Sequence, residues 1–228
     1  MNEHPIIINR LSLTGELCYQ STTLLTYQID YPQMKSVRYA QTVPSINQFY
    51  QTEATEFEKY CRLELYPDAL NQFHYSLEHA LTVIPYEAMV TYKVTYNANG
   101  IVSLYFDRYL FTGGAHGTTK RYSDTWDLKT GRRLKLKDFY PEGTDCKARL
   151  LAEIALQISR APDQFFEDYH KLLQESFNTA DFYMTDEGIV IYFQQYDIAP
   201  YSSGIPQFLI PFGQKHSLIC CSLTAPLL

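Results

Sequence analysis

The sequence lacks the features that mark membrane proteins, disordered chains and nucleic-acid binders. None of its apolar stretches approaches the ~20 residues that a membrane helix needs, so we expect no membrane insertion. Charged residues are scarce, at 19% of the 228 residues, whereas 46% are hydrophobic, which is typical of a folded globular chain. Asp and Glu (25) outnumber Lys and Arg (19), and this acidic balance argues against a nucleic-acid partner.

Cysteine usage excludes a disulfide framework and a zinc ribbon. The five cysteines are odd in number and widely spaced, and none forms a C-x-x-C pair. Reduced and mostly buried thiols are expected instead, which favours a reducing compartment. The start of the chain, MNEHPIIINRLSL, has too short an apolar run for a signal peptide. As the sequence stands, it predicts a cytoplasmic protein.

The local motifs of catalysis and cofactor binding are also missing. There is no G-x-S-x-G elbow, no H-E-x-x-H and no phosphate-binding glycine pattern ahead of a helix. We therefore predict no catalytic residue, no metal site and no cofactor from local motifs. A site assembled from residues distant in sequence stays open.

Aromatic residues are abundant, with 20 Tyr and 13 Phe against a single Trp. Tyr and Phe suit half-buried strands, and Tyr also suits recognition surfaces because it gives contact area at low entropic cost. Most of these residues fall in strand-like segments, so the structural interpretation is favoured over the functional one.

Period-two and helical patterns alternate along the chain in blocks. Strands are predicted at 5–14, 16–31, 86–110 (a hairpin turning at Asn99-Gly100), 119–136 (a hairpin turning at 128–131), 181–185, 189–194, 206–211 and 216–223. Thr14-Gly15-Glu16 is the expected first turn, and Pro32 the expected end of the second strand. Helices are predicted at about 46–65, with Ser45 as a possible N-cap, at 67–82, 144–159 and 163–177; Pro67 separates the first two, and Pro162 lies near the start of the last.

This order is not the strand–helix alternation of a parallel doubly wound fold. It predicts an α+β class, with antiparallel sheets and helices packed on one face. The two helix pairs indicate two closely packed subdomains, residues 1–108 and 109–228, with the boundary near 108–118.

Two segments invite a functional interpretation. Thr112 to Gly117 (TGGAHG) forms a loop between strands, either a tight turn or a ligand-facing loop with His116 as a polar contact. Residues 108–137 carry eight basic side chains against Asp124 and Asp127, so this stretch could attract an anionic partner. It could equally be a solvated face or dock on the acidic helix at 46–65.

The segments YLFTGGAHG (109–117) and FYMTDEGIVIYFQQYDIAPYSSGIPQFLIP (182–211) resemble the paired domains of unknown function in RsiV-type anti-sigma factors and PdaC-type peptidoglycan deacetylases. Asp127 to Gly131 and Leu134 to Phe139 extend the similarity, which covers about 105–212 well and 25–105 more loosely. In the first type the domain is an extracytoplasmic lysozyme receptor, and in the second it accompanies a separate deacetylase domain. In neither does the paired domain carry known catalytic residues.

The resemblance implies a non-catalytic binding module for a protein, a lysozyme-like one among them, or for a cell-wall glycan. The residues expected to line the binding surface are Tyr109, Gly113, Gly114, His116, Tyr196, Asp197 and Tyr201. Tyr196, Asp197 and Tyr201 could instead fix their loop from inside.

Two other functions stay open. One is a cell-wall hydrolase or deacetylase in which His116 works with a carboxylate such as Asp197 or Asp124. The other is a structural homo-oligomer joined through an exposed strand. The sequence does not fix the oligomeric state.

Overall fold

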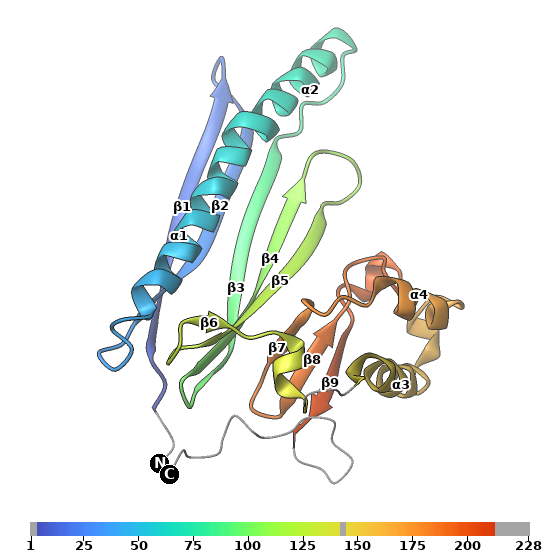
Figure 1. The fold of residues 1–228 in the computed structure, drawn as a ribbon. Helices are drawn as coiled ribbons and strands as arrows, with labels where there is room; N and C mark the ends of the chain where they lie inside the picture. Colours follow the sequence, from blue (N-terminus) through green and yellow to red (C-terminus); the bar gives the residue numbers. More distant parts are fainter. Residues whose placement is uncertain (1–3, 142–144, 213–228) are drawn as a thin grey trace. The chain divides into compact units, whose positions relative to one another are not determined.

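The computed structural model describes residues 4–141 and 145–212 and has the mixed α+β architecture that the sequence predicts (Figure 1). The fold class is therefore confirmed. The predicted strand at 216–223, with Cys220 and Cys221, lies outside the described residues.

Contacts within the chain divide it into two units. One unit comprises residues 6–92 and 106–120, and the other comprises the described residues of 1–5, 93–105 and 121–228. Three long strands pass from one unit into the other, so the units interleave in sequence. The boundary at 108 and the close packing of two subdomains stay predictions.

The larger sheet has six strands in the order β1-β2-β3-β4-β5-β6. These are β1 (Ile7–Tyr19), β2 (Thr22–Lys35), β3 (Tyr86–Ala98), β4 (Ile101–Phe111), β5 (Thr118–Asp127) and β6 (Arg132–Arg133). The β1–β2 and β5–β6 pairs are antiparallel. The β2–β3 pair is parallel because the chain returns through a helical crossover between them.

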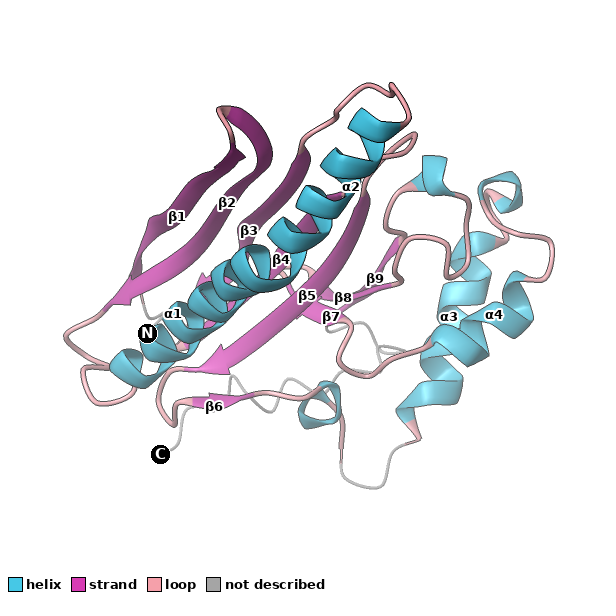
Figure 2. Cartoon of the chain, turned by 90° about the horizontal axis from the view of Figure 1, so that it is seen from above, coloured by secondary structure: helices cyan, strands magenta, loops and turns pink. Residues whose placement is uncertain are grey.

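That crossover is one long helix rather than two. Helix α1 (Val43–Tyr60) continues through a π-helical turn (Cys61–Leu65) into α2 (Tyr66–Glu78), and it lies across one face of the sheet (Figure 2). The buried side chains beneath it come from the helix and from β2 and β3: Leu24, Leu25, Tyr27, Ile29, Ala54, Phe57, Cys61, Leu65, Ala69, Phe73, Tyr86, Ala88 and Val90.

The predicted break at Pro67 is wrong, and the π-helical turn explains why. Proline inside an α-helix removes one hydrogen bond and clashes with the carbonyl four residues earlier. Here Tyr66 N–H bonds the Cys61 carbonyl five residues back, and the widened turn lets Pro67 enter the first turn of α2. Ser45 is not the N-cap either, because the helix begins at Val43 and the Ser45 hydroxyl donates to the Thr42 carbonyl.

The first turn also lies elsewhere than predicted. Strand β1 runs straight through Gly15, and the chain reverses at Gln20 and Ser21, with φ of 44° and 69°. Gly15 pairs with Tyr27 on β2, and a Cβ on Gly15 would lie 2.3 Å from that ring. The glycine therefore admits a neighbouring aromatic ring instead of turning the chain. Pro32 does not end β2, which continues to Lys35.

The second unit holds a three-stranded antiparallel sheet, β7 (Phe182–Met184), β8 (Gly188–Tyr192) and β9 (Gln207–Pro211), with helices α3 (Cys146–Ile158) and α4 (Tyr169–Ser176). Short 3₁₀ helices lie at Leu136–Phe139, Pro162–Gln164 and Tyr201–Ser203. Leu150, Ile154 and Ile158 of α3 pack with Ile189 and Ile191 of β8 in one core. The predicted hairpin turn at Asn99-Gly100 is confirmed, with φ of 54° and 76°.

Candidate binding surface

The tyrosine-rich link after β8 presents two aromatic rings together. Tyr196 is 52% exposed, and its ring centroid lies 5.9 Å from that of Tyr201 at an interplanar angle of 33°. Tyr196 has φ of 68°, a left-handed conformation that is uncommon for a large side chain. Such strain persists only where the surrounding structure holds the residue in place.

Hydrogen bonds within the link hold that conformation. The Asp197 carboxylate accepts from Gln194 N–H at 2.8 Å, and Asp197 N–H donates back to the Gln194 carbonyl at 3.2 Å. Ile198 and Ala199 are buried in the core below. This is the geometry of a residue that fixes its loop. Direct ligand contact by Asp197 stays a prediction.

The Gln194 side chain ties the link to strand β5. Its amide nitrogen donates to the Arg121 carbonyl at 2.8 Å, and its amide oxygen accepts from Arg121 N–H at 2.9 Å. The buried Arg121 guanidinium in turn lies 3.7 Å over the ring of Tyr105. Local sequence patterns gave no sign of this brace, because Arg121 and Gln194 are 73 residues apart.

A second point of attachment lies further along the same link. Phe166 N–H donates to the Ile198 carbonyl at 3.0 Å, and the Ser203 hydroxyl donates to the Gln164 carbonyl at 2.9 Å. The tyrosine pair is thus carried by a segment fixed on two sides, so its two rings are pre-organised rather than free to collapse.

The TGGAHG loop belongs to the other unit and joins β4 to β5. Gly113 and Gly114 have φ of 93° and 90°, and a Cβ on either would meet open space. Gly117 packs against the ring of Tyr109, and a ring nitrogen of His116 lies 3.0 Å from the Gly117 carbonyl. That this loop and the tyrosine pair form one surface stays a prediction, as does a catalytic role for His116.

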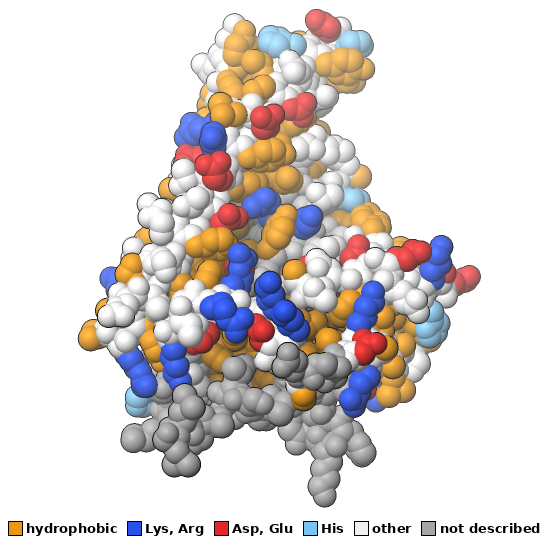
Figure 3. All heavy atoms as spheres, in the orientation of Figure 1, with side chains coloured by type: hydrophobic (Ala, Val, Ile, Leu, Met, Phe, Trp, Pro, Cys, Tyr) orange, Lys and Arg blue, Asp and Glu red, His pale blue; other side chains and the backbone are white. Residues whose placement is uncertain are grey.

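Charge neutralisation reduces the basic character of residues 108–137. Arg133 forms an ion pair with Asp124 at 2.7 Å, and Arg132 with Asp138 at 2.9 Å, one residue beyond the stretch. On the face drawn in Figure 3, Lys and Arg side chains (blue) are interspersed with Asp and Glu (red). The stretch is therefore less of an anion-attracting patch than its composition indicates.

The ionisable groups with shifted pKa values are mainly buried tyrosines and one cysteine. Burial raises the pKa of the Cys61 thiol to about 11, so this thiol is protonated at neutral pH and is a poor nucleophile. Burial and then the Glu58 carboxylate raise the pKa of Tyr27 to about 12. Cys18, Cys61 and Cys146 form no disulfide.

Metal-binding and membrane-spanning features are absent from the part of the chain that the structure describes. Residues 4–141 and 145–212 hold no group of three or more His, Cys, Asp or Glu side chains able to bind a metal ion. Nor is any helix within those residues long and apolar enough to cross a membrane.

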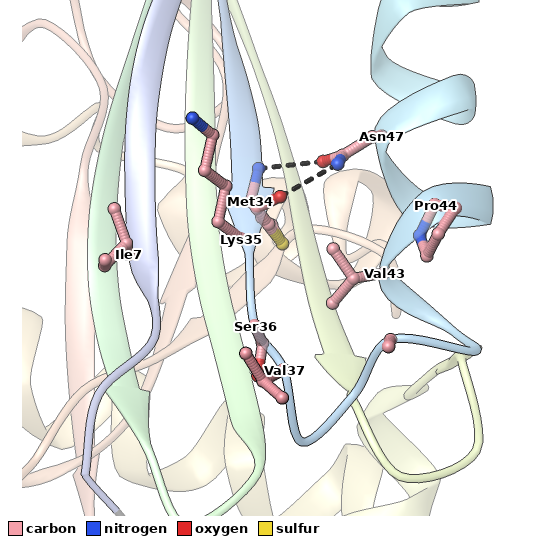
Figure 4. Close-up of a pocket in the computed structure, with 9 residues that line it drawn as sticks. Ile7, Met34, Lys35, Ser36, Val37, Val43, Pro44 and Asn47 are labelled. Atoms are coloured by element: carbon pink, nitrogen blue, oxygen red, sulfur yellow. Dashed lines mark hydrogen bonds between the residues drawn. The ribbon is translucent and has the colours of Figure 1, made fainter.

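A pocket of about 590 Å³ lies where β2 leads into α1 (Figure 4). Its wall is mainly apolar and includes Met34, Val37 and Val43, with Lys35 at the side. The Asn47 side chain bonds both the N–H and the carbonyl of Met34, at 2.8 and 2.9 Å, as a neighbouring strand would. None of the residues predicted from the sequence lies in this pocket, and it contains no acid–base pair.

Comparison with known proteins gives matches to two family models and to one curated relative. Residues 18–119 match the family model "Deacetylase PdaC", and residues 137–213 match "Protein of unknown function (DUF3298)". The peptidoglycan-N-acetylmuramic acid deacetylase PdaC of Bacillus subtilis is 24% identical over 178 residues, which cover 76% of this chain. The match spans only 34% of that deacetylase.

Two solved structures of DUF3298 family proteins share the fold. The one from Pseudomonas aeruginosa has a TM-score of 0.66 at 21% identity and covers 97% of both chains. The one from Bacteroides fragilis has a TM-score of 0.66 at 18% identity and covers 93% of this chain and 92% of its own. The resemblance to RsiV-type proteins stays a prediction. The chain therefore carries a region that matches the PdaC model followed by a region that matches the DUF3298 model, which is the paired arrangement that the sequence predicts.

Proposed function

We propose that the chain is a non-catalytic binding module that recognises cell-wall glycan through the surface around Tyr196 and Tyr201. The observation that carries the proposal is the exposed Tyr196 ring, held at φ of 68° beside Tyr201 on a braced link. A rigid aromatic pair offers apolar faces for the C–H groups of a sugar ring, with hydroxyl groups at the rim.

The family context favours glycan over protein as the ligand. The relative from Bacillus subtilis is a peptidoglycan deacetylase by name, and this chain matches about a third of its length. A module that accompanies such chemistry gains from holding the polymer, because a second attachment point raises the effective concentration of substrate. A lysozyme-like protein partner is the competing outcome that the experiment separates.

The test is a calorimetric titration of the full chain with purified muropeptides and, separately, with C-type lysozyme. Tyr196→Asn removes the ring but keeps a residue that tolerates the left-handed conformation, and Tyr201→Ala removes the second ring. Each variant is expected to weaken muropeptide binding by about tenfold, the worth of one aromatic packing contact. Tyr75→Ala is the matched control, because Tyr75 in α2 is 50% exposed and stacks on His79, the residue that follows that helix.

Each result decides between the alternatives. Unchanged binding in both tyrosine variants would remove this surface, and binding of lysozyme alone would replace the glycan by a protein. A loss of affinity in His116→Ala would add the TGGAHG loop to the site. Release of acetate or of new reducing ends from the muropeptides would overturn the non-catalytic part of the proposal.

A further inference from the structure

Strand β1 lies at the margin of its sheet and offers one long edge. It is the terminal strand in the order β1-β2-β3-β4-β5-β6, and no other strand among the described residues pairs with its outer side (Figure 2). At 13 residues it is longer than a typical edge strand, and such an edge is a template for pairing with another chain.

The side chains of β1 divide between two faces. Leu13 and Leu17 pack toward the core beneath α1 and α2, so the odd-numbered residues point to the helix face and the even-numbered ones to the other. Leu11, Leu13 and Leu17 are only partly buried, while Arg10 and Glu16 are exposed on the opposite face. An edge neighbour would therefore cover leucines on one face and meet two charges on the other.

The spacing of those charges is symmetric about Leu13. We propose that two copies of this chain pair antiparallel along β1, about a two-fold axis through Leu13. Arg10 of each copy then lies opposite Glu16 of the other, so the dimer has two such ion pairs. Leu13 of one copy lies opposite Leu13 of the other, and Leu11 of each copy lies opposite Gly15 of the other.

Competing registers lack this match. A two-fold axis perpendicular to the sheet preserves its faces, so the register changes only in steps that keep odd residues opposite odd ones. One such step in either direction places Arg10 opposite Thr14 or Cys18, and Glu16 opposite Ile8 or Ser12. The register centred on Leu13 alone brings the opposite charges together.

The local structure of β1 leaves this pairing intact. The register between β1 and β2 is regular until a shift between Leu17 and Cys18, so residues 9–17 form an even stretch outside the irregularity. The Arg10 side chain is 63% exposed, and its guanidinium lies 3.6 Å from the Asp30 carboxylate. The Glu16 carboxylate is exposed and accepts from the Thr23 hydroxyl. Both side chains are thus exposed but turned over the sheet, Arg10 toward Asp30 and the Tyr92 ring and Glu16 toward Thr23, so pairing across the dimer requires them to turn outward.

Charge reversal tests the proposal in the full chain by sedimentation velocity over a wide range of protein concentration. The unaltered protein is expected to show a concentration-dependent dimer. Glu16→Arg sets like charges opposite each other twice per dimer and is expected to weaken association by about tenfold or more. Glu87→Arg is the matched control, since Glu87 is exposed on the interior strand β3 of the same sheet and should leave the dimer unchanged.

The double variant Arg10→Glu/Glu16→Arg restores opposite charges and is expected to recover the dimer. Circular dichroism melting of each variant separates lost association from lost folding, because Arg10→Glu also removes the neighbour of Asp30. Hydrogen exchange should show that the amides of residues 9–17 that point away from β2 are protected only where the dimer forms. A chain that stays monomeric throughout, a dimer indifferent to Glu16→Arg, or a folded double variant that stays monomeric would each overturn the proposal.

Discussion

At the scale of single residues, Gly15 shows how one missing side chain fixes a contact between strands. Its Cα pairs with Tyr27, and the Tyr27 ring occupies the space where a Cβ would stand. The ring does not move away easily, because Tyr27 is buried and its hydroxyl bonds both Glu58 and Arg62 on the helix. The glycine is thereby linked to the attachment of the helix to the sheet.

We therefore expect Gly15→Val to lower the free energy of unfolding by about 1–3 kcal/mol, the usual cost of overpacking a filled site. Urea denaturation measures the change. Thr14→Val is the control, since Thr14 is an exposed neighbour on the opposite face and its replacement should stay within about 0.5 kcal/mol. Equal effects of the two variants would contradict the role assigned to the Tyr27 ring.

At the scale of elements, two hairpin turns solve the same backbone problem with different residues. The β3–β4 turn places Asn99 and Gly100 at positive φ, which is the preferred chemistry. The β1–β2 turn places Gln20 and Ser21 there, at φ of 44° and 69°, although neither is favoured in the left-handed region. A residue that favours positive φ is therefore expected to stabilise the protein at the β1–β2 turn.

Opposite changes in stability follow for the two turns. Ser21→Gly is expected to raise the free energy of unfolding by about 0.5–1 kcal/mol, and Gly100→Ala to lower it by about 1 kcal/mol or more. Urea midpoints of both variants against the parent provide the measurement. If Ser21→Gly destabilises the chain, the strain assigned to Ser21 is wrong.

These elements also show what a single sequence can predict. The Asn99-Gly100 hairpin follows from local chemistry and is found. The helices are found too, except that the one predicted at 163–177 begins only at Tyr169, after a short 3₁₀ helix at Pro162–Gln164. The turn at Gln20 is missed because its residues are not typical of turns. The turn is predicted at Gly15 instead because glycine is common in turns, whereas here the glycine makes room for the Tyr27 ring on another strand. Pro67 misleads for a similar reason, since proline breaks an α-helix but not this π-helical turn.

The candidate site, too, could be predicted from the sequence only in part. The tyrosine-rich link can be singled out from composition and family resemblance, and Tyr196 is exposed beside Tyr201. Its left-handed backbone and the brace from Gln194 to Arg121 are invisible to local patterns, because they depend on a contact across 73 residues. Residue types thus indicate a surface, while tertiary contacts decide how rigidly it is presented.

At the scale of the whole molecule, the distribution of charge decides whether electrostatics serve binding or stability. The net charge of −6 and the eight basic residues of 108–137 together indicate a basic patch on an acidic body. The ion pair with Asp124 neutralises the charge of Arg133, one of those eight basic residues. Only about 9% of the Asp124 side chain is exposed, against 51% for Arg133. Removing the cation from a buried carboxylate costs more stability than removing it from an exposed one, because the buried charge is left uncompensated.

Arg133→Gln is therefore expected to lower the free energy of unfolding by about 1–2 kcal/mol, a value discounted because the arginine itself is half exposed. Lys137→Gln is the control, since Lys137 is exposed and makes the same change in net charge. Urea denaturation at low and at high salt measures both variants. The difference between Arg133→Gln and the parent should shrink in high salt, because screening weakens the pair in the parent. Equal stabilities of Arg133→Gln and Lys137→Gln would contradict the stabilising role assigned to the ion pair of Arg133 with Asp124.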